Sequence, residues 1–254
     1  GESPEESNVS RRVILKGAGL VAAGGAFIAA GAVTLAGMAE AGKGAKGPVY
    51  PWPYRKINPQ KAAEIAYNNW YRNFCSFAAA SGIIIPERRL VGEPWTSYPL
   101  MSLKFGEGGV EGWGTLCGTL LGGSVAISLA AGHEGKPMIN DLMQWYSETM
   151  QPVFEPENPR ARFKSRTVSD SPLCHISVGK WMKAEGKSLG SPERRDRCAR
   201  LTASVSFQIA VMLNDWHDGK YKRSYTGRQS DFGITTQNNC TDCHGSDVPT
   251  RIDG

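Results

Sequence analysis

The first strongly periodic stretch of the chain lies between residues 61 and 80. Apolar side chains recur there every three or four positions, which predicts an amphipathic helix with one buried face. Asn58 followed by Pro59 is typical of a helix start, because asparagine caps the free amides and proline fits the first turn. Gly82 is predicted to end the helix.

A second long helix is predicted from Ser191 and Pro192, which again form a cap followed by proline, to the residues just before Gly219. Shorter helices are expected over residues 140–150 and from residue 172 to about 184. No alternating run is long enough for a sheet. The pattern therefore predicts an all-α fold, a helical bundle with long irregular loops.

Residues 113–132 are small, apolar and rich in glycine, and they are barely long enough to cross a bilayer. The repeated glycines favour a buried helix that neighbouring backbones approach closely. Residues 82–113, with several prolines and glycines, are expected to be loop, with a short extended piece over residues 101–105.

The N-terminal residues 1–47 have the features of a targeting segment. Ser10-Arg11-Arg12 begins a pattern that resembles a twin-arginine export signal, and an uncharged run of Gly, Ala, Val and Leu follows it. Ala39-Glu40-Ala41 offers a cleavage site, yet residues 13–39 are long enough to remain as a membrane anchor. We expect export to a periplasmic or other extracytoplasmic compartment and leave cleaved signal and retained anchor open.

Composition adds little to this picture. Charged residues make up 21% and hydrophobic residues 41% of the 254 residues, as in ordinary globular proteins. The net charge of +5 is too weak and too dispersed to indicate nucleic-acid binding.

The most specific motif is Cys240-Thr241-Asp242-Cys243-His244, which reads C-x-x-C-H, the attachment signature of c-type haem. Each thiol adds across one vinyl group of the porphyrin, and His244 then binds the iron as proximal ligand. A zinc site would need a second ligand pair at matching spacing, and a thioredoxin-like dithiol would need a βαβ setting. We find neither near Cys240, so haem c is the predicted cofactor of residues 219–254.

The four other cysteines are separated by 42, 57 and 24 residues and lie near the ends or the beginnings of predicted helices: Cys75, Cys117, Cys174 and Cys198. Two disulfides, inert buried thiols, and a metal or iron–sulfur site with four thiolate ligands all remain possible from spacing alone. Since the twin-arginine route carries folded proteins that already hold a cofactor, the export signal favours a cluster inserted before export.

These segments carry a resemblance. Cys75 followed by Ala78 to Gly82, Cys117-Gly118, Cys174-His175 and Arg197-Cys198 are similar to the helical redox family named C_GCAxxG_C_C. The family's second cysteine of the first motif is replaced here by Ser76-Phe77-Ala78. With the C-terminal haem motif added, the chain resembles the split-Soret cytochromes c over roughly residues 58–245.

The resemblance implies a homodimer with closely packed bis-His haems. It also implies a 2Fe–2S centre on Cys75, Cys117, Cys174 and Cys198. We expect the helical domain that carries these cysteines to span residues 48–218. The distal haem ligand is expected among three histidines. His217, which ends the helix before the haem segment, is preferred over His133 and His175, with the same chain and the partner chain both open as its source.

The sequence therefore predicts an electron carrier with one haem c and one cluster per chain. It would serve partner redox proteins of an extracytoplasmic respiratory chain. No acid–base pair or nucleophilic triad indicates an enzyme. A haem-linked thiol or cluster oxidoreductase and a membrane-anchored subunit of a larger respiratory complex remain the alternatives.

Overall fold

A computed structural model describes residues 49–224 of the chain. Five α-helices and two 3₁₀ helices make up the regular structure of these residues: α3 (Pro59–Leu90), η2 (Leu100–Gly106), α4 (Gly118–Ala131), η3 (Gly132–Glu134), α5 (Gly135–Glu148), α6 (Cys174–Glu185) and α7 (Pro192–His217). Extended pairing in this part of the chain is limited to two isolated bridges. The predicted all-α class is confirmed.

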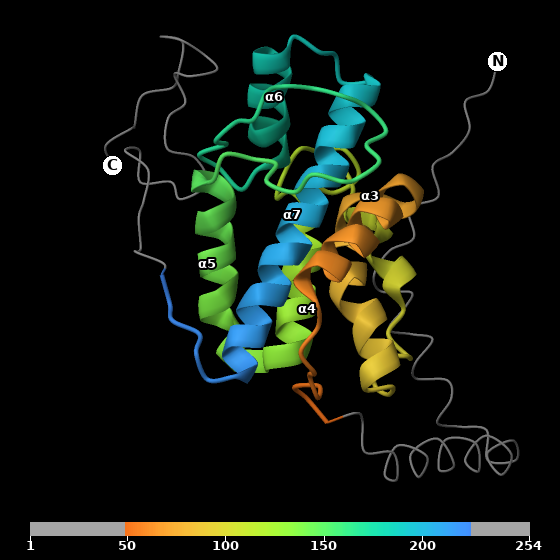
Figure 1. The fold of residues 1–254 in the computed structure, drawn as a ribbon, viewed down its shortest axis with the longest axis vertical. Coiled ribbons are helices and arrows are strands. Elements are labelled where there is room, and N and C mark those ends of the chain that lie inside the picture. Colours follow the sequence, from red (N-terminus) through yellow and green to blue (C-terminus); the bar gives the residue numbers. More distant parts are fainter. Residues whose placement is uncertain (1–48, 225–254) are drawn as a thin grey trace, which may run out of the picture. The chain divides into compact units, whose positions relative to one another are not determined.

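Helix α7 forms the centre of the bundle. It packs against α3, α4 and α5, and Figure 1 shows it running between α5 on one side and α3 on the other. Its start is the predicted one, because Ser191 Oγ accepts a hydrogen bond from the amide of Arg194 and Pro192 follows. The middle of α7 is buried on nearly all sides, as a central helix must be.

Helix α3 departs from the prediction. Asn58 caps it and Pro59 begins it as expected, but Gly82 does not end it, and the helix runs on to Leu90. An added Cβ at Gly82 would lie 2.7 Å from the Ala62 carbonyl oxygen and 2.9 Å from the Ser206 Cβ. Glycine at this position therefore allows close packing inside a helix, where the sequence pattern indicated a stop.

The helical path of α3 breaks at Phe74, whose φ of 58° and ψ of −163° lie outside the helical region. The segment after the break packs back on the segment before it, and Asn69 Nδ2 donates to Ser81 Oγ across the pair at 2.9 Å. Cys75 is therefore the first residue after a sharp turn. The sequence pattern had indicated a position near the C-terminal end of an unbroken helix.

Two further expectations are corrected. Residues 101–105 belong to the 3₁₀ helix η2, whereas an extended piece was expected. The apolar stretch expected over residues 113–132 becomes helical only from Gly118, and its helix α4 is buried in the core as predicted. Within residues 49–224, no helix combines the length and the apolar character that a membrane crossing requires.

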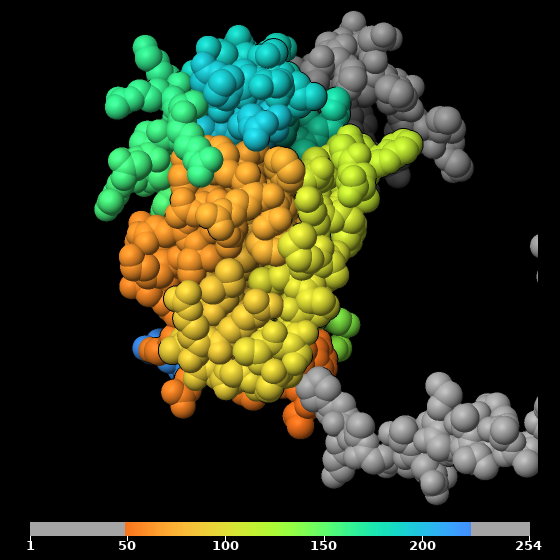
Figure 2. All heavy atoms as spheres, turned by 90° about the vertical axis from the view of Figure 1, so that its right-hand side faces the viewer, coloured from red at the N-terminus to blue at the C-terminus, as the bar shows by residue number. Residues whose placement is uncertain are grey.

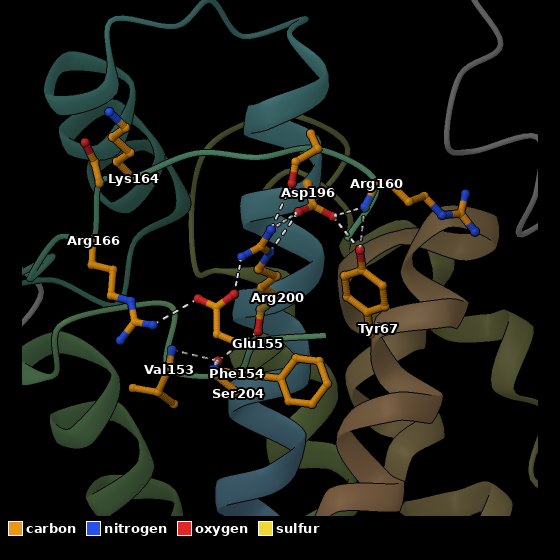
Figure 3. Close-up of polar contacts among 12 residues, drawn as sticks. Tyr67, Val153, Phe154, Glu155, Arg160, Lys164, Arg166, Asp196, Arg200 and Ser204 are labelled. Atoms are coloured by element: carbon orange, nitrogen blue, oxygen red, sulfur yellow. Dashed lines mark hydrogen bonds and ion pairs between the residues drawn. The ribbon is translucent and has the colours of Figure 1, made fainter. Parts of the chain in front are cut away.

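The long connection between α5 and α6, residues 149–173, is tied to α7 by polar contacts (Figure 3). Ser204 Oγ accepts the amides of Val153 and Phe154, at 3.1 and 3.0 Å. Asp196 is fully buried, pairs with Arg200 at 2.8 Å and accepts the amide of Arg160. An irregular segment is in this way held over the first half of α7.

Candidate metal centre

Three of the four cysteines stand where a helix begins. Cys75 follows the break in α3, Cys117 is the N-cap of α4, and Cys174 is the first residue of α6. Cys198 lies in the second turn of α7. Because unpaired amides at a helix start carry partial positive charge, these positions stabilise a thiolate.

A short backbone pairing brings two of these helix starts together. Leu116 and Leu173 form an antiparallel bridge. The amide of Cys117 donates to the Pro172 carbonyl at 2.9 Å, and the amide of Cys174 donates to the Thr115 carbonyl at 2.7 Å. Two cysteines far apart in the sequence are thus adjacent across one ladder.

Two glycines allow the backbone to come close to Cys75 and Cys174. An added Cβ at Gly118 would lie 2.8 Å from the Cys75 Cβ and 2.0 Å from the Gly106 carbonyl oxygen. An added Cβ at Gly109 would lie 2.8 Å from the Cys174 Cβ. The segment that carries Gly109 follows η2 and lies on the surface beside α3, in yellow-green in Figure 2. Side chains larger than hydrogen at either glycine would push the cysteine-bearing backbones apart.

The thiols are largely shielded from water. Cys75, Cys117 and Cys198 are buried, and Cys174 is partly buried. Trp70 donates its indole N–H to Cys75 Sγ at 3.2 Å, and Cys117 Sγ lies 3.3 Å from the Thr119 hydroxyl. Buried thiols that still have polar partners are suited to carry negative charge.

The sulfurs act on one another electrostatically. The pKa of Cys117 is lowered to about 6, first because Cys174 hydrogen-bonds to its sulfur, and against the opposing effect of burial. The pKa of Cys174 is raised by that same hydrogen bond, then by burial and by the charges of Cys117, Cys198 and Cys75. Burial and the charges of Cys117 and Cys198 raise the pKa of Cys75. The four thiols therefore share one region of the fold.

These four cysteines are free thiols in this structure. Across residues 49–224, no three or more His, Cys, Asp or Glu side chains already stand in the arrangement of a metal site. The fold brings the four cysteine-bearing backbones together, and the ligand geometry of an occupied site is not formed by the side chains as they stand.

The three histidines divide between two ends of the bundle. His175 adjoins Cys174 and is exposed, with its amide bonded to the Gly114 carbonyl. His217 ends α7, nineteen residues beyond Cys198, or roughly 28 Å along a straight helix. Trp216 Nε1 donates to Glu134 Oε2 at 2.9 Å, so the ends that carry His217 and His133 are neighbours.

His217 packs its ring 6.0 Å from that of Tyr54, and its Nδ1 lies 3.5 Å from Asp218 Oδ1. His133 is exposed in η3. The haem motif, with Cys240, Cys243 and His244, lies outside the described residues. The preference for His217 as distal ligand stays a prediction.

Comparisons with known proteins identify the family of this chain. The model of the family described as "Putative redox-active protein (C_GCAxxG_C_C)" matches residues 84–211. Split-Soret cytochrome c of Desulfovibrio desulfuricans is 35% identical over 249 residues, which covers 93% of this chain and 88% of that protein. This chain belongs to the split-Soret cytochrome c family.

A solved structure supports the same conclusion at the level of the fold. The structure titled "A novel iron centre in the split-Soret cytochrome c from Desulfovibrio desulfuricans ATCC 27774" superposes with a TM-score of 0.67 and 31% sequence identity. The match covers 80% of this chain and 88% of that one. A redox, electron-transfer role follows from membership of the split-Soret family.

The donor set of this split-Soret chain fits thiolate-bound iron. Four buried or partly buried thiols are a suitable ligand set for an iron–sulfur centre. The guanidinium of Arg197 is fully buried, and its Nε and Nη1 have no hydrogen-bond partner among the described residues. An isolated buried cation requires a nearby anion, and ligated thiolates would supply it.

Sequence reasoning missed three residues of this site: Trp70, Tyr146 and Arg197. For Arg197 a signal existed, because it precedes Leu201 by four positions and so lies on the predicted buried face of its helix. A charged residue at a predicted core position indicates a buried charge, and such a charge needs a compensating group nearby. No pattern in the sequence connected Trp70 or Tyr146 with a particular cysteine.

Proposed function

We propose that the chain is an electron-transfer protein with two iron centres. One is a c-type haem held by Cys240 and Cys243, with His244 as proximal ligand. The other is an iron–sulfur centre of the 2Fe–2S type on Cys75, Cys117, Cys174 and Cys198. Haem iron and thiolate-bound iron each cycle between two oxidation states, which supplies one-electron chemistry.

The observation that carries the proposal is the convergence of four distant cysteines. Backbone bridging at Leu116 and Leu173 and close approach at Gly118 gather Cys117, Cys174 and Cys75 in one buried region. Cys198 lies in the same buried cluster as Cys75. Scattered inert thiols need neither device. The chain's own contribution is to exclude water and to hold three of the four sulfurs at helix starts.

Iron and haem stoichiometry of natively purified protein tests the proposal. We expect about three irons per chain, one of them as covalently bound haem, and an EPR signal of a reduced iron–sulfur centre. Iron equal to haem, with no second signal, would contradict the second centre. Replacement of both Cys240 and Cys243 by alanine should abolish covalent haem and leave non-haem iron in place.

We further propose a homodimer with closely packed haems, reached by twin-arginine export to an extracytoplasmic compartment. The resemblance supports it, because a divided Soret band arises when neighbouring porphyrins couple. Sedimentation of haem-loaded protein should give a dimer, and its Soret band should be split.

Two further variants test the export signal and the distal haem ligand. Replacement of Arg11 and Arg12 by lysine should leave the protein in the cytoplasm. His217→Ala should convert the oxidised haem from six-coordinate low-spin to five-coordinate.

A dithiol oxidoreductase is the second candidate, and one observation favours it. Backbone pairing sets Cys117 beside Cys174, and Cys174 lowers the pKa of the Cys117 thiol, as in a reactive thiolate paired with a second thiol. The iron measurement separates the two functions, because a dithiol enzyme would contain haem iron alone. In such an enzyme, mild oxidation would join Cys117 and Cys174 in a disulfide, so that titration finds two fewer thiols per chain. A reductant would restore both thiols.

A further inference from the structure

Arg197 is the most unusual buried group in the described chain. It directly precedes Cys198 on α7, and it ranks among the largest side chains that are fully buried. Its Nη2 donates to Ser177 Oγ at 2.8 Å. Its Nε and Nη1 find no hydrogen-bond partner within residues 49–224.

Arg200, one turn further along the same helix, shows how this fold satisfies a buried guanidinium. Its Nε donates to Asp196 Oδ2 at 2.8 Å, its Nη2 donates to the Ala161 carbonyl at 2.8 Å, and its Nη1 pairs with Glu155 (Figure 3). Arginine does not lose its proton in proteins, so a guanidinium without such partners remains a buried charge. Leaving a buried charge uncompensated is strongly destabilising.

The groups that face Arg197 are the thiol region and one tyrosine. Burial acts to lower the pKa of Arg197. The charges of Cys198, Tyr146 and Cys117 and the contact of the guanidinium with the Cys198 side chain raise it, and the net direction is upward. Tyr146 is itself fully buried, and its hydroxyl has no partner in the described residues. Two residues with unsatisfied donors therefore border the same cysteines.

We propose that Arg197 is the fixed counter-charge of the four-cysteine iron site, which it stabilises more strongly in the reduced state. This proposal rests on the proposed function. Ligation converts neutral thiols to thiolates, and reduction adds one more negative charge to the site. A positive charge in a region of low dielectric constant favours each of these changes.

The experiment uses the full chain loaded with haem and non-haem iron, with Arg197→Met and Arg197→Lys as the variants. Redox titration followed by EPR gives the midpoint potential of the non-haem iron. We expect Arg197→Met to lower the equilibrium constant for its reduction about tenfold, which is 59 mV for one electron. Arg197→Lys keeps the charge and should retain most of the wild-type potential.

A second measurement separates a counter-charge from a packing role. After removal of non-haem iron with a chelator, Arg197 is a buried cation without an anion. Arg197→Met should therefore raise the midpoint of unfolding of the iron-free chain above that of wild type. Arg200→Met is the control, since it breaks a satisfied network and should lower the unfolding midpoint with and without iron.

Every outcome decides the proposal. An unchanged potential in Arg197→Met overturns it, as does an iron-free Arg197→Met chain that is less stable than wild type. If Arg197→Met retains no non-haem iron, the iron-free stability alone decides, and a more stable chain supports the counter-charge. If wild type itself contains only haem iron, the proposed function fails before any variant is made, and the role of Arg197 fails with it.

Discussion

Leu116 and Leu173 form an antiparallel bridge between the loop before α4 and the loop before α6, and this pairing sets Cys117 beside Cys174. The bridge lies directly before both helix starts. One pair of backbone contacts therefore determines where two helices begin relative to each other.

Gly118→Ala should disrupt the cysteine region. The new methyl group would lie 2.0 Å from the Gly106 carbonyl oxygen and 2.8 Å from the Cys75 Cβ, so a backbone must move. We expect a loss of about 1–3 kcal/mol in the free energy of unfolding and loss of non-haem iron. Gly179→Ala in α6 is the matched control, because its Cβ meets nothing within 4 Å, and it should stabilise by about 0.5–1 kcal/mol. Denaturant unfolding and iron analysis measure both effects.

Trp70→Phe should alter the iron centre specifically. The change removes the N–H that reaches Cys75 Sγ at 3.2 Å and preserves most of the aromatic packing. A thiolate without this donor is more basic, so the midpoint potential of the non-haem iron should fall. Trp181→Phe removes a comparable hydrogen bond to the Ser165 carbonyl at 2.9 Å. Both variants should lose about 1 kcal/mol of stability, and an equal change of potential in both would contradict a direct effect on sulfur.

Asp196→Asn should be among the most destabilising single changes in the chain. Asp196 is fully buried, and its loss of charge leaves Arg200 without its buried partner. We expect a cost of about 3–5 kcal/mol in urea unfolding. Asp170→Asn breaks the more exposed pair with Lys180, at 2.7 Å, and should cost less than about 1 kcal/mol. Similar losses in the two variants would show that burial does not decide the strength of these pairs.

Glu87→Gln should change how stability depends on pH. Burial raises the pKa of Glu87 from 4.5 to about 7, although the amide of Arg55 donates to Oε2 and opposes the shift. Between pH 4.5 and 7 the folded chain holds this proton more tightly than the unfolded chain, so stability falls as the pH rises.

The glutamine variant should lack this contribution and be more stable than wild type above pH 7, by roughly 1–3 kcal/mol. Urea unfolding at several pH values measures the slope. Glu93→Gln is the control, because Glu93 is exposed and its pKa is lowered by Ser97. In this variant the free energy of unfolding should still fall as the pH rises, as in wild type. If the free energy of unfolding of Glu87→Gln still falls with rising pH, another titrating group is responsible.

Local chemistry made the helix starts predictable. Asn58 and Ser191 cap their helices, each followed by proline, and Gly186 ends α6 with a φ of 69°. Such signals depend on a few adjacent residues, so they can be read without the fold. The end of α3 could not be predicted in this way. Gly82 lies where Ala62 and α7 leave no room for a side chain, and that contact is visible only in the fold.

The sequence by itself determined the helical class, the haem motif at Cys240 to His244, and the presence of four further cysteines. Spacing did not determine whether these cysteines would be scattered, paired or gathered. The tertiary structure decided that they share one region, through a turn at Phe74, a bridge at Leu116 and close packing at Gly118. It alone revealed Arg197 as a buried charge beside them, because burial and missing partners are properties of packing between helices that are distant in the sequence.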